Sequence, residues 1–124
     1  MSDINYTIIG TVSKGVFRQT FNAASVTASM SVSGMYAVSL ELGTAVTQVS
    51  TASLSSLGIC FAQNISTVAT HTVSFGRYDG PSSTLHETLT LRAGEAAVLR
   101  LSSGNYAAKS AAAGSRMTLA IYEG

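Results

Sequence analysis

The feature that most constrains this chain is a strict alternation of apolar and hydroxyl side chains. Between positions 25 and 33, Val, Ala, Met and Val alternate with four serines and a threonine. Successive side chains of a β-strand point to opposite faces, so this run predicts a strand with one apolar and one hydroxyl face. The run 36–42 repeats the pattern, and Ser33-Gly34 between the two runs is a turn signal. The two runs are therefore predicted to pair as a hairpin.

Further short strands are predicted along the whole chain, separated by residues that favour turns. They are expected at Tyr6–Val12, Gly15–Phe21, Ala45–Val49, Gly58–Ile65, Thr70–Tyr78, Leu85–Leu91, Glu95–Leu101, Tyr106–Ser110 and Arg116–Tyr122. The clearest connections are the loop 78–83 and the tight turn 92–94. Helical spacing of apolar residues is not sustained in any segment, and the alanine-rich stretch 107–113 is interpreted as a strand end followed by a loop.

This pattern of many short strands predicts an all-β fold, a single-domain β-sandwich that is jelly-roll-like and built from short antiparallel strands. A chain of 124 residues corresponds to one domain. Within 1–124, residues 1–56 are expected to supply Ser/Thr-rich strands and a loop, and residues 57–124 the strands that complete the same sandwich. No internal repeat or linker interrupts it.

Charge is scarce, and this limits the partners that the chain can have. Charged residues make up 10% of the sequence and the formal net charge is +1, whereas 19 serines and 14 threonines supply the polarity. A nucleic-acid-binding domain needs a strongly basic patch, which this composition does not provide. No stretch approaches the roughly 20 apolar residues of a membrane span, and no basic region precedes an apolar block at the N-terminus. We therefore expect no nucleic acid and no membrane as partner, and we expect self-association, to which lightly charged proteins tend.

The sequence offers little material for catalysis, and no catalytic residue, cofactor or metal site is expected. The set His71, His86 and Glu87 was the best zinc candidate, but the alternation places the two histidines on different strand faces. Cys60 lies in an apolar strand without a neighbouring base that would lower its pKa, so it is interpreted as a small buried hydrophobe. The chain is therefore expected not to be an enzyme.

Two sets of residues are nevertheless singled out for structural roles. Arg100 lies within an apolar strand, and a structural ion pair is expected because Arg suits buried or interfacial pairs. Its partner is expected to be Glu95, with Glu87 or an acid of a neighbouring subunit as the alternatives. Aromatic and Arg side chains are enriched at interface hot spots. On that ground, the predicted interface residues are Tyr6, Phe17, Arg18, Tyr36, Tyr78 and Tyr106.

The C-terminal half carries an ordered set of segments that resembles a known group of proteins. The segments are Leu57–Ile65, a strand ending at Tyr78, Leu89–Leu101 with its turn at 92–94, Tyr106–Lys109 and Met117–Glu123. Their order is similar to that of small β-rich structural proteins of tailed-bacteriophage virions, over roughly residues 57–123. The chain departs from that pattern at Gln63, Ser66 and Ala93, where the group has a basic residue, Asp and Pro.

The resemblance implies a non-enzymatic virion protein that is made in the cytoplasm of the bacterial host. A capsid decoration (cement) protein is the first expectation, with the major capsid protein or other virion proteins as partners. A homotrimer is favoured because capsids offer local three-fold positions. A neck, tail or head-fibre component is an open alternative within the class, and a host-glycan-binding module is the alternative from another class.

Overall fold

A computed structural model describes residues 3–31, 34–51 and 54–124, apart from the side chain of Phe17. Throughout the described residues the regular secondary structure is β, with ten strands in antiparallel sheets and no helix, which confirms the predicted all-β class. No helix in this part of the chain is long and apolar enough to cross a membrane. The chain divides into two compact units, Met1–Ser31 and Val32–Gly124, which are described separately.

The N-terminal unit is a long antiparallel hairpin of β1 (Ile4–Lys14) and β2 (Phe17–Ala28). A two-residue loop joins the strands, and its Gly15 has a φ of 59°, a conformation that favours glycine. The register shifts once, because the pairing passes from Tyr6↔Val26 to Ile8↔Ala23. At this bulge Ser25 has a φ of 54°, and its amide donates a hydrogen bond to Thr7 Oγ1 over 3.2 Å.

The predicted hairpin between the runs 25–33 and 36–42 is wrong. Residues 25–28 are the end of β2, where Ser25 lies in the bulge and residues 26–28 pair with β1, whereas β3 (Met35–Leu42) pairs with β10. Positions 32 and 33 of the predicted strand lie outside the described residues. The physical reason is the bulge, which shifts the alternation of β2 by one residue, so that one bulged strand resembles two separate strands in the sequence.

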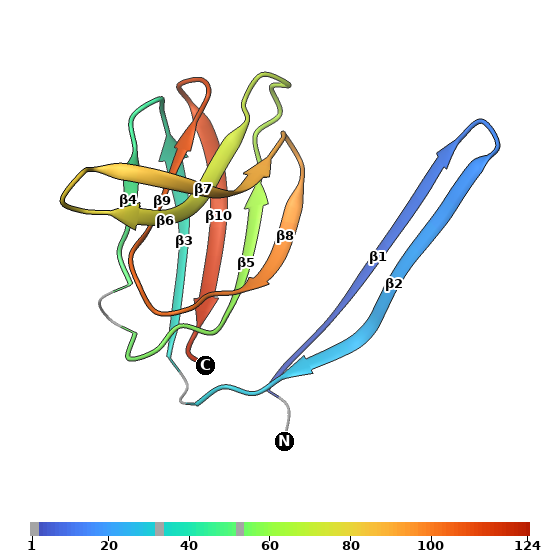
Figure 1. Ribbon diagram of the computed structural model, residues 1–124, viewed down its shortest axis with the longest axis horizontal. Helices are drawn as coiled ribbons and strands as arrows, with labels where there is room; N and C mark the ends of the chain where they lie inside the picture. The colour runs from blue at the N-terminus through green and yellow to red at the C-terminus, as the bar shows by residue number, and fades with distance from the viewer. Residues whose placement is uncertain (1–2, 32–33, 52–53) are drawn as a thin grey trace. The chain divides into compact units, whose positions relative to one another are not determined.

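The second unit is a sandwich of two four-stranded sheets (Figure 1). One sheet has the order β3-β10-β5-β8 and the other the order β4-β9-β6-β7. Their remaining bounds are β4 (Thr47–Val49), β5 (Ile59–Asn64), β6 (Val73–Asp79), β7 (Thr84–Leu91), β8 (Ala96–Arg100), β9 (Tyr106–Ser110) and β10 (Ser115–Tyr122). The sandwich thus consists of β3–β10, whereas the sequence analysis placed the strands of residues 1–31 in it as well.

The core lies between these two sheets and is built by the inward phase of each strand. The buried set includes Leu42, Val49, Cys60, Ala62, Val73, Phe75, Leu91, Tyr106, Ala108, Met117, Leu119 and Ile121. The rings of Phe75 and Tyr106 stack with 5.7 Å between their centroids. Each large apolar side chain buried here stabilises the fold by about 1.5–3 kcal/mol relative to exposure, so the alternation seen in the sequence is what specifies this core.

One buried polar side chain fastens the two sheets to each other. Asn64, at the end of β5, is fully buried, and its Nδ2 donates to the carbonyl oxygens of His71 (2.7 Å) and Leu91 (3.0 Å). Its Oδ1 accepts a hydrogen bond from the amide of Ser66 over 3.0 Å. Because His71 precedes β6 and Leu91 ends β7, this amide joins one sheet to the end of β7 and to the segment that leads into β6 of the other sheet.

Candidate functional site

The outer side of the sheet β3-β10-β5-β8 presents two rows of mostly small, uncharged side chains. The register aligns Ala37 with Ala120, Phe61 and Val98 in one row. The next row aligns Ser39 with Thr118, Gln63 and Ala96. We call these eight residues the small-residue face. They belong to the strand phase opposite to the core, which explains why they face outward.

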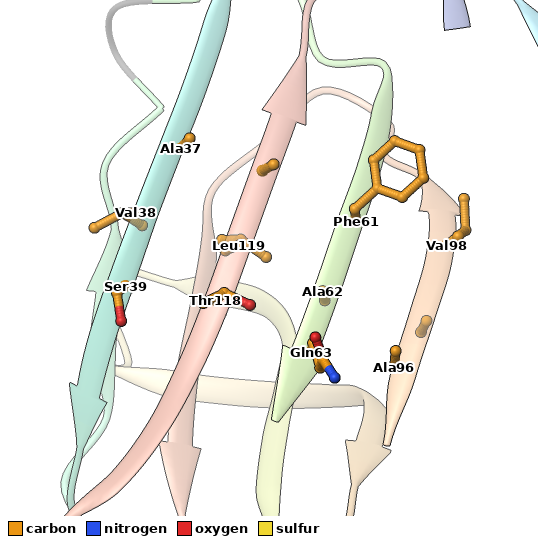
Figure 2. Close-up of a pocket in the computed structure, with 12 residues that line it drawn as sticks. Ala37, Val38, Ser39, Phe61, Ala62, Gln63, Ala96, Val98, Thr118 and Leu119 are labelled. Carbon is orange, nitrogen blue, oxygen red and sulfur yellow. The ribbon is translucent and has the colours of Figure 1, made fainter. Parts of the chain in front are cut away.

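The small-residue face is hollowed. A shallow depression of about 570 Å³ lies over it, and Figure 2 shows its side chains arranged along the four strands. Phe61 is the largest side chain of the face, and its ring meets the ring of Tyr122 edge to face with centroids 6.0 Å apart. Because alanine, serine and threonine side chains are short, larger side chains of a partner can approach the sheet closely here.

Charged groups lie at the ends of this face and not within it. Arg116 and Glu41 form an exposed ion pair of 3.6 Å at one end, and Arg100 lies at the other end, level with Ile59. The sheet β4-β9-β6-β7 differs, because the ion pair of Lys109 with Glu87, 3.5 Å long, joins two of its strands. Burying a charge costs several kcal/mol unless it is well paired, so the small-residue face is the sheet surface that is easiest to cover with protein.

The hairpin carries a second apolar surface. On one side Ile8, Gly10 and Val12 lie opposite Ala23, Phe21 and Gln19, and the register continues through the bulge to Tyr6 with Val26 and Ile4 with Ala28. We call this side the arm face. Val12 is 54% exposed and Phe21 is 62% exposed. The opposite side pairs Thr11 with Thr20 and Ser13 with Arg18 and is mostly polar, although Ile9, which is 65% exposed, also lies on it.

The six predicted interface residues do not form one surface. Tyr6 lies on the arm face, Arg18 lies exposed on the opposite side of the hairpin, and Phe17 belongs to β2 with a side chain outside the described part. Within the sandwich, Tyr78 is partly buried near the end of β6. Tyr36 packs against the core, and Tyr106 is 5% exposed with its hydroxyl donating to Ser102 O over 2.6 Å. Both tyrosines follow the inward phase of their strands. Tyr106 is a core residue, whereas Tyr36 is partly buried against the core, and a role of Tyr36 at an interface stays a prediction.

The predicted ion pair between Arg100 and Glu95 does not form. Glu95 Oε1 accepts a hydrogen bond from the amide of Arg92 over 2.6 Å and thereby closes the turn at 92–95. The Glu95 amide also donates to Arg92 O, and Gly94 has a φ of 84°, so the predicted tight turn is confirmed. Arg100 lies at the far end of β8 from this turn. The carboxylate of Glu95, which closes the turn, is therefore not available to Arg100.

The titratable groups of the described residues do not gather into a reactive site. In residues 3–31, 34–51 and 54–124, no cluster of three His, Cys, Asp or Glu side chains is placed to hold a metal ion. His86 is exposed and aligned with Arg77, whereas His71 precedes β6. Burial raises the pKa of the Cys60 thiol to about 12, so this cysteine stays protonated at neutral pH, as expected for a small buried hydrophobe.

No family model, no curated protein and no solved structure matches this chain. The small-residue face was not among the predicted sites, because alanine, serine and threonine carry no chemical signature. A signal was present, since the outward phases of β8 and β10 combine Ala96 and Val98 with Thr118 and Ala120. An exposed strand phase this poor in charge is unusual for a sheet surface that stays in water.

Proposed function

We propose that this chain is a non-enzymatic structural subunit of a repeated assembly, and that the assembly is a bacteriophage particle whose capsid it decorates. The observation that carries the proposal is the small-residue face. A four-stranded sheet surface that is hollowed, uncharged and lined with short side chains can be covered by protein at little desolvation cost. Such a surface serves contact between proteins better than it serves chemistry.

Two further points support a virion protein in particular. The order of segments between residues 57 and 123 resembles that of small β-rich proteins of tailed-phage virions. The strand orders β3-β10-β5-β8 and β4-β9-β6-β7 also favour the jelly-roll interpretation, because eight strands divided in this way over two sheets suit two Greek keys. Jelly rolls are common among viral capsid domains. Homo-oligomers, with a trimer first, are the expected form on local three-fold positions.

The copy number of the chain in purified particles tests this proposal. Quantitative mass spectrometry against the major capsid protein is expected to give a ratio of the same order as one chain per capsid subunit. A copy number of about a dozen or fewer per particle would instead assign the chain to the neck or tail. Its absence from particles would refute the virion proposal altogether.

A pair of variants then tests the small-residue face. Ala120→Glu places a charge in the centre of this face, whereas Thr90→Glu places the same charge at an exposed position of β7 in the other sheet. We expect Ala120→Glu to lower the affinity for particles at least about 30-fold, the effect of losing one hot spot, and Thr90→Glu to leave the affinity unchanged. Equal affinity of both variants would exclude this face from the contacts that hold the chain on the particle, whether its partner there is the capsid or a second copy of the chain.

A further inference from the structure

The hairpin cannot be explained by its own packing. Its arm face leaves Val12 and Phe21 more than half exposed, and two strands alone cannot bury both sides of a sheet. An isolated two-stranded hairpin is marginally stable at best in water. An arm of 11 and 12 residues per strand therefore needs a surface against which its apolar side packs.

We propose that the arm face of one copy packs on the small-residue face of a second copy, so that each copy in the oligomer donates one arm and accepts one. The proposal rests on the proposed function only in treating the chain as self-associating. The partner of both apolar surfaces is a second copy of this chain. The arm face of each copy is covered by the small-residue face of another copy.

Shape supports this pairing of surfaces. The arm face carries the larger side chains, Ile8, Val12 and Phe21, whereas the middle of the small-residue face is made of short ones such as Ala37, Ala120 and Thr118. Large side chains that project into a shallow hollow of about 570 Å³ restore the packing density of a protein interior. Two arm faces or two small-residue faces are less complementary, because they oppose large to large or short to short.

Charge supports it as well. The charged groups beside the small-residue face are the Arg116–Glu41 pair and Arg100, which lie at its ends. On the arm face the one charged residue in the described register is Lys14, next to the turn at the tip of the hairpin. The middles of both surfaces are uncharged, so bringing them together buries no unpaired ion.

The area available matches what a stable interface requires. Eight-residue strands such as β3 and β10 span about 27 Å at about 3.4 Å per residue, and a two-stranded arm is about 10 Å wide. Such an overlap covers about 270 Å² of each surface. Two copies that exchange arms make two such contacts, which cover about 540 Å² per copy and about 1,080 Å² in total, just above the roughly 1,000 Å² expected of a biological interface. Exchange in a closed ring leaves no arm and no face uncovered.

The experiment is a complementation test with full-length variants, read as oligomeric mass by light scattering at micromolar concentration. Phe21→Glu disables the arm face and leaves the small-residue face intact; Ala120→Glu does the reverse. Matched controls are Thr20→Glu on the hydroxyl side of the hairpin and Thr90→Glu on the other sheet. Circular dichroism and thermal unfolding verify that each variant is folded, and Val12→Glu and Ala37→Glu replace any variant that is not.

The expected result has three parts. The wild type and both controls are oligomers. Each disabled variant, measured by itself, associates at least about 30-fold more weakly than the wild type. An equimolar mixture of Phe21→Glu with Ala120→Glu forms a heterodimer through the one contact that is intact, between the arm face of Ala120→Glu and the small-residue face of Phe21→Glu. A wild type that is monomeric overturns the inference, as does a mixture that stays monomeric. The inference is also overturned if only one of the two disabled variants loses association while the other associates like the wild type, because arm-to-arm or face-to-face contact is then responsible. A monomer in solution that is still found at capsid copy number on particles would refute the exchange and leave the proposed function standing.

Discussion

Replacing Asn64 should cost the sandwich more stability than any other single polar substitution discussed here. Its amide group makes three hydrogen bonds, two donated to the carbonyl oxygens of His71 and Leu91 and one accepted from the amide of Ser66. The side chain is fully buried, so Asn64→Ala removes these hydrogen bonds from the interior of the sandwich. The partners left behind retain their desolvation cost without a hydrogen bond.

The magnitude follows from that geometry. Each net hydrogen bond contributes about 1 kcal/mol, and each buried group left without a partner costs about 1–3 kcal/mol, so Asn64→Ala should lower the free energy of unfolding by about 3–5 kcal/mol. This is a large part of the 5–15 kcal/mol typical of a domain. For a unit of this size it corresponds to a fall in Tm on the order of 15 °C.

Asn64→Asp tests the donors separately from the shape of the side chain. The carboxylate is nearly isosteric, but it turns an oxygen toward carbonyl oxygens that Nδ2 contacts at 2.7 and 3.0 Å. The charged form is therefore disfavoured in the folded state, and the pKa of this aspartate should be raised above its ordinary value of about 3.9. The penalty of Asn64→Asp should consequently be larger at pH 7 than at pH 4, where protonation supplies one donor.

The free energy of unfolding is measured by urea unfolding followed by circular dichroism. All variants are compared at one fixed protein concentration, because self-association adds apparent stability. Asn105→Ala, at an exposed asparagine before β9, is the matched control and should lie within about 0.5 kcal/mol of the wild type. If Asn64→Ala costs less than about 1 kcal/mol, or if Asn64→Asp is as stable at pH 7 as at pH 4, the role assigned to this amide is refuted.

Two further predictions concern the core and the register shift between β6 and β7, where Thr88 is the extra residue opposite Phe75 and Gly76. The Cys60 thiol has its pKa raised by burial to about 12 from an ordinary value of 9.0, so folding favours its protonated form and stability is lost as pH rises from about 9 toward 12. The difference in unfolding free energy between wild type and Cys60→Ala should shrink on the order of 1 kcal/mol between pH 8 and pH 10; a constant difference contradicts this. Gly76→Ala places a Cβ 2.0 Å from the carbonyl oxygen of His86, so it should lower the free energy of unfolding in urea by about 3 kcal/mol. Gly43 has open space around it, so Gly43→Ala should leave the free energy of unfolding unchanged. Equal effects of the two variants would refute the steric argument.

The strands were predictable from the sequence because alternation is a local signal. Tyr106–Ser110 was predicted with its observed bounds, and Leu85–Leu91 and Arg116–Tyr122 each differ from the observed strand by one residue. Strand pairing was not predictable in the same way. The shift of phase at Ser25 resembled the beginning of a new strand. Gly34 resembled a turn, although its carbonyl oxygen accepts a hydrogen bond from the amide of Glu123, which is far away in sequence. Such choices depend on contacts between residues far apart in sequence.

The candidate site was harder to predict for a related reason. Charged and aromatic residues are the usual candidates for a site in a sequence, but here they have local structural roles. Glu95 closes a turn, and Tyr106 fills the core. The face that the structure reveals consists of residues that are unremarkable one by one. It becomes visible when the register places Ala37, Ala120 and Phe61 side by side on three strands. A surface made of common residues is defined by their alignment, which the sequence does not state.

The few charged residues of this chain are distributed unevenly over the two sheets of the sandwich. With 10% charged residues, an even distribution would put some of them on each sheet surface. Instead the ion pair Lys109–Glu87 joins strands of the sheet β4-β9-β6-β7, and the pair Arg116–Glu41 lies at the end of the other sheet. The hydroxyl and methyl groups between these ends hydrate weakly compared with ions, so the small-residue face is stable in water and inexpensive to cover. Recognition through such a face depends on the fit of side chains and on apolar area, because no charge is present in its centre to select or repel a partner.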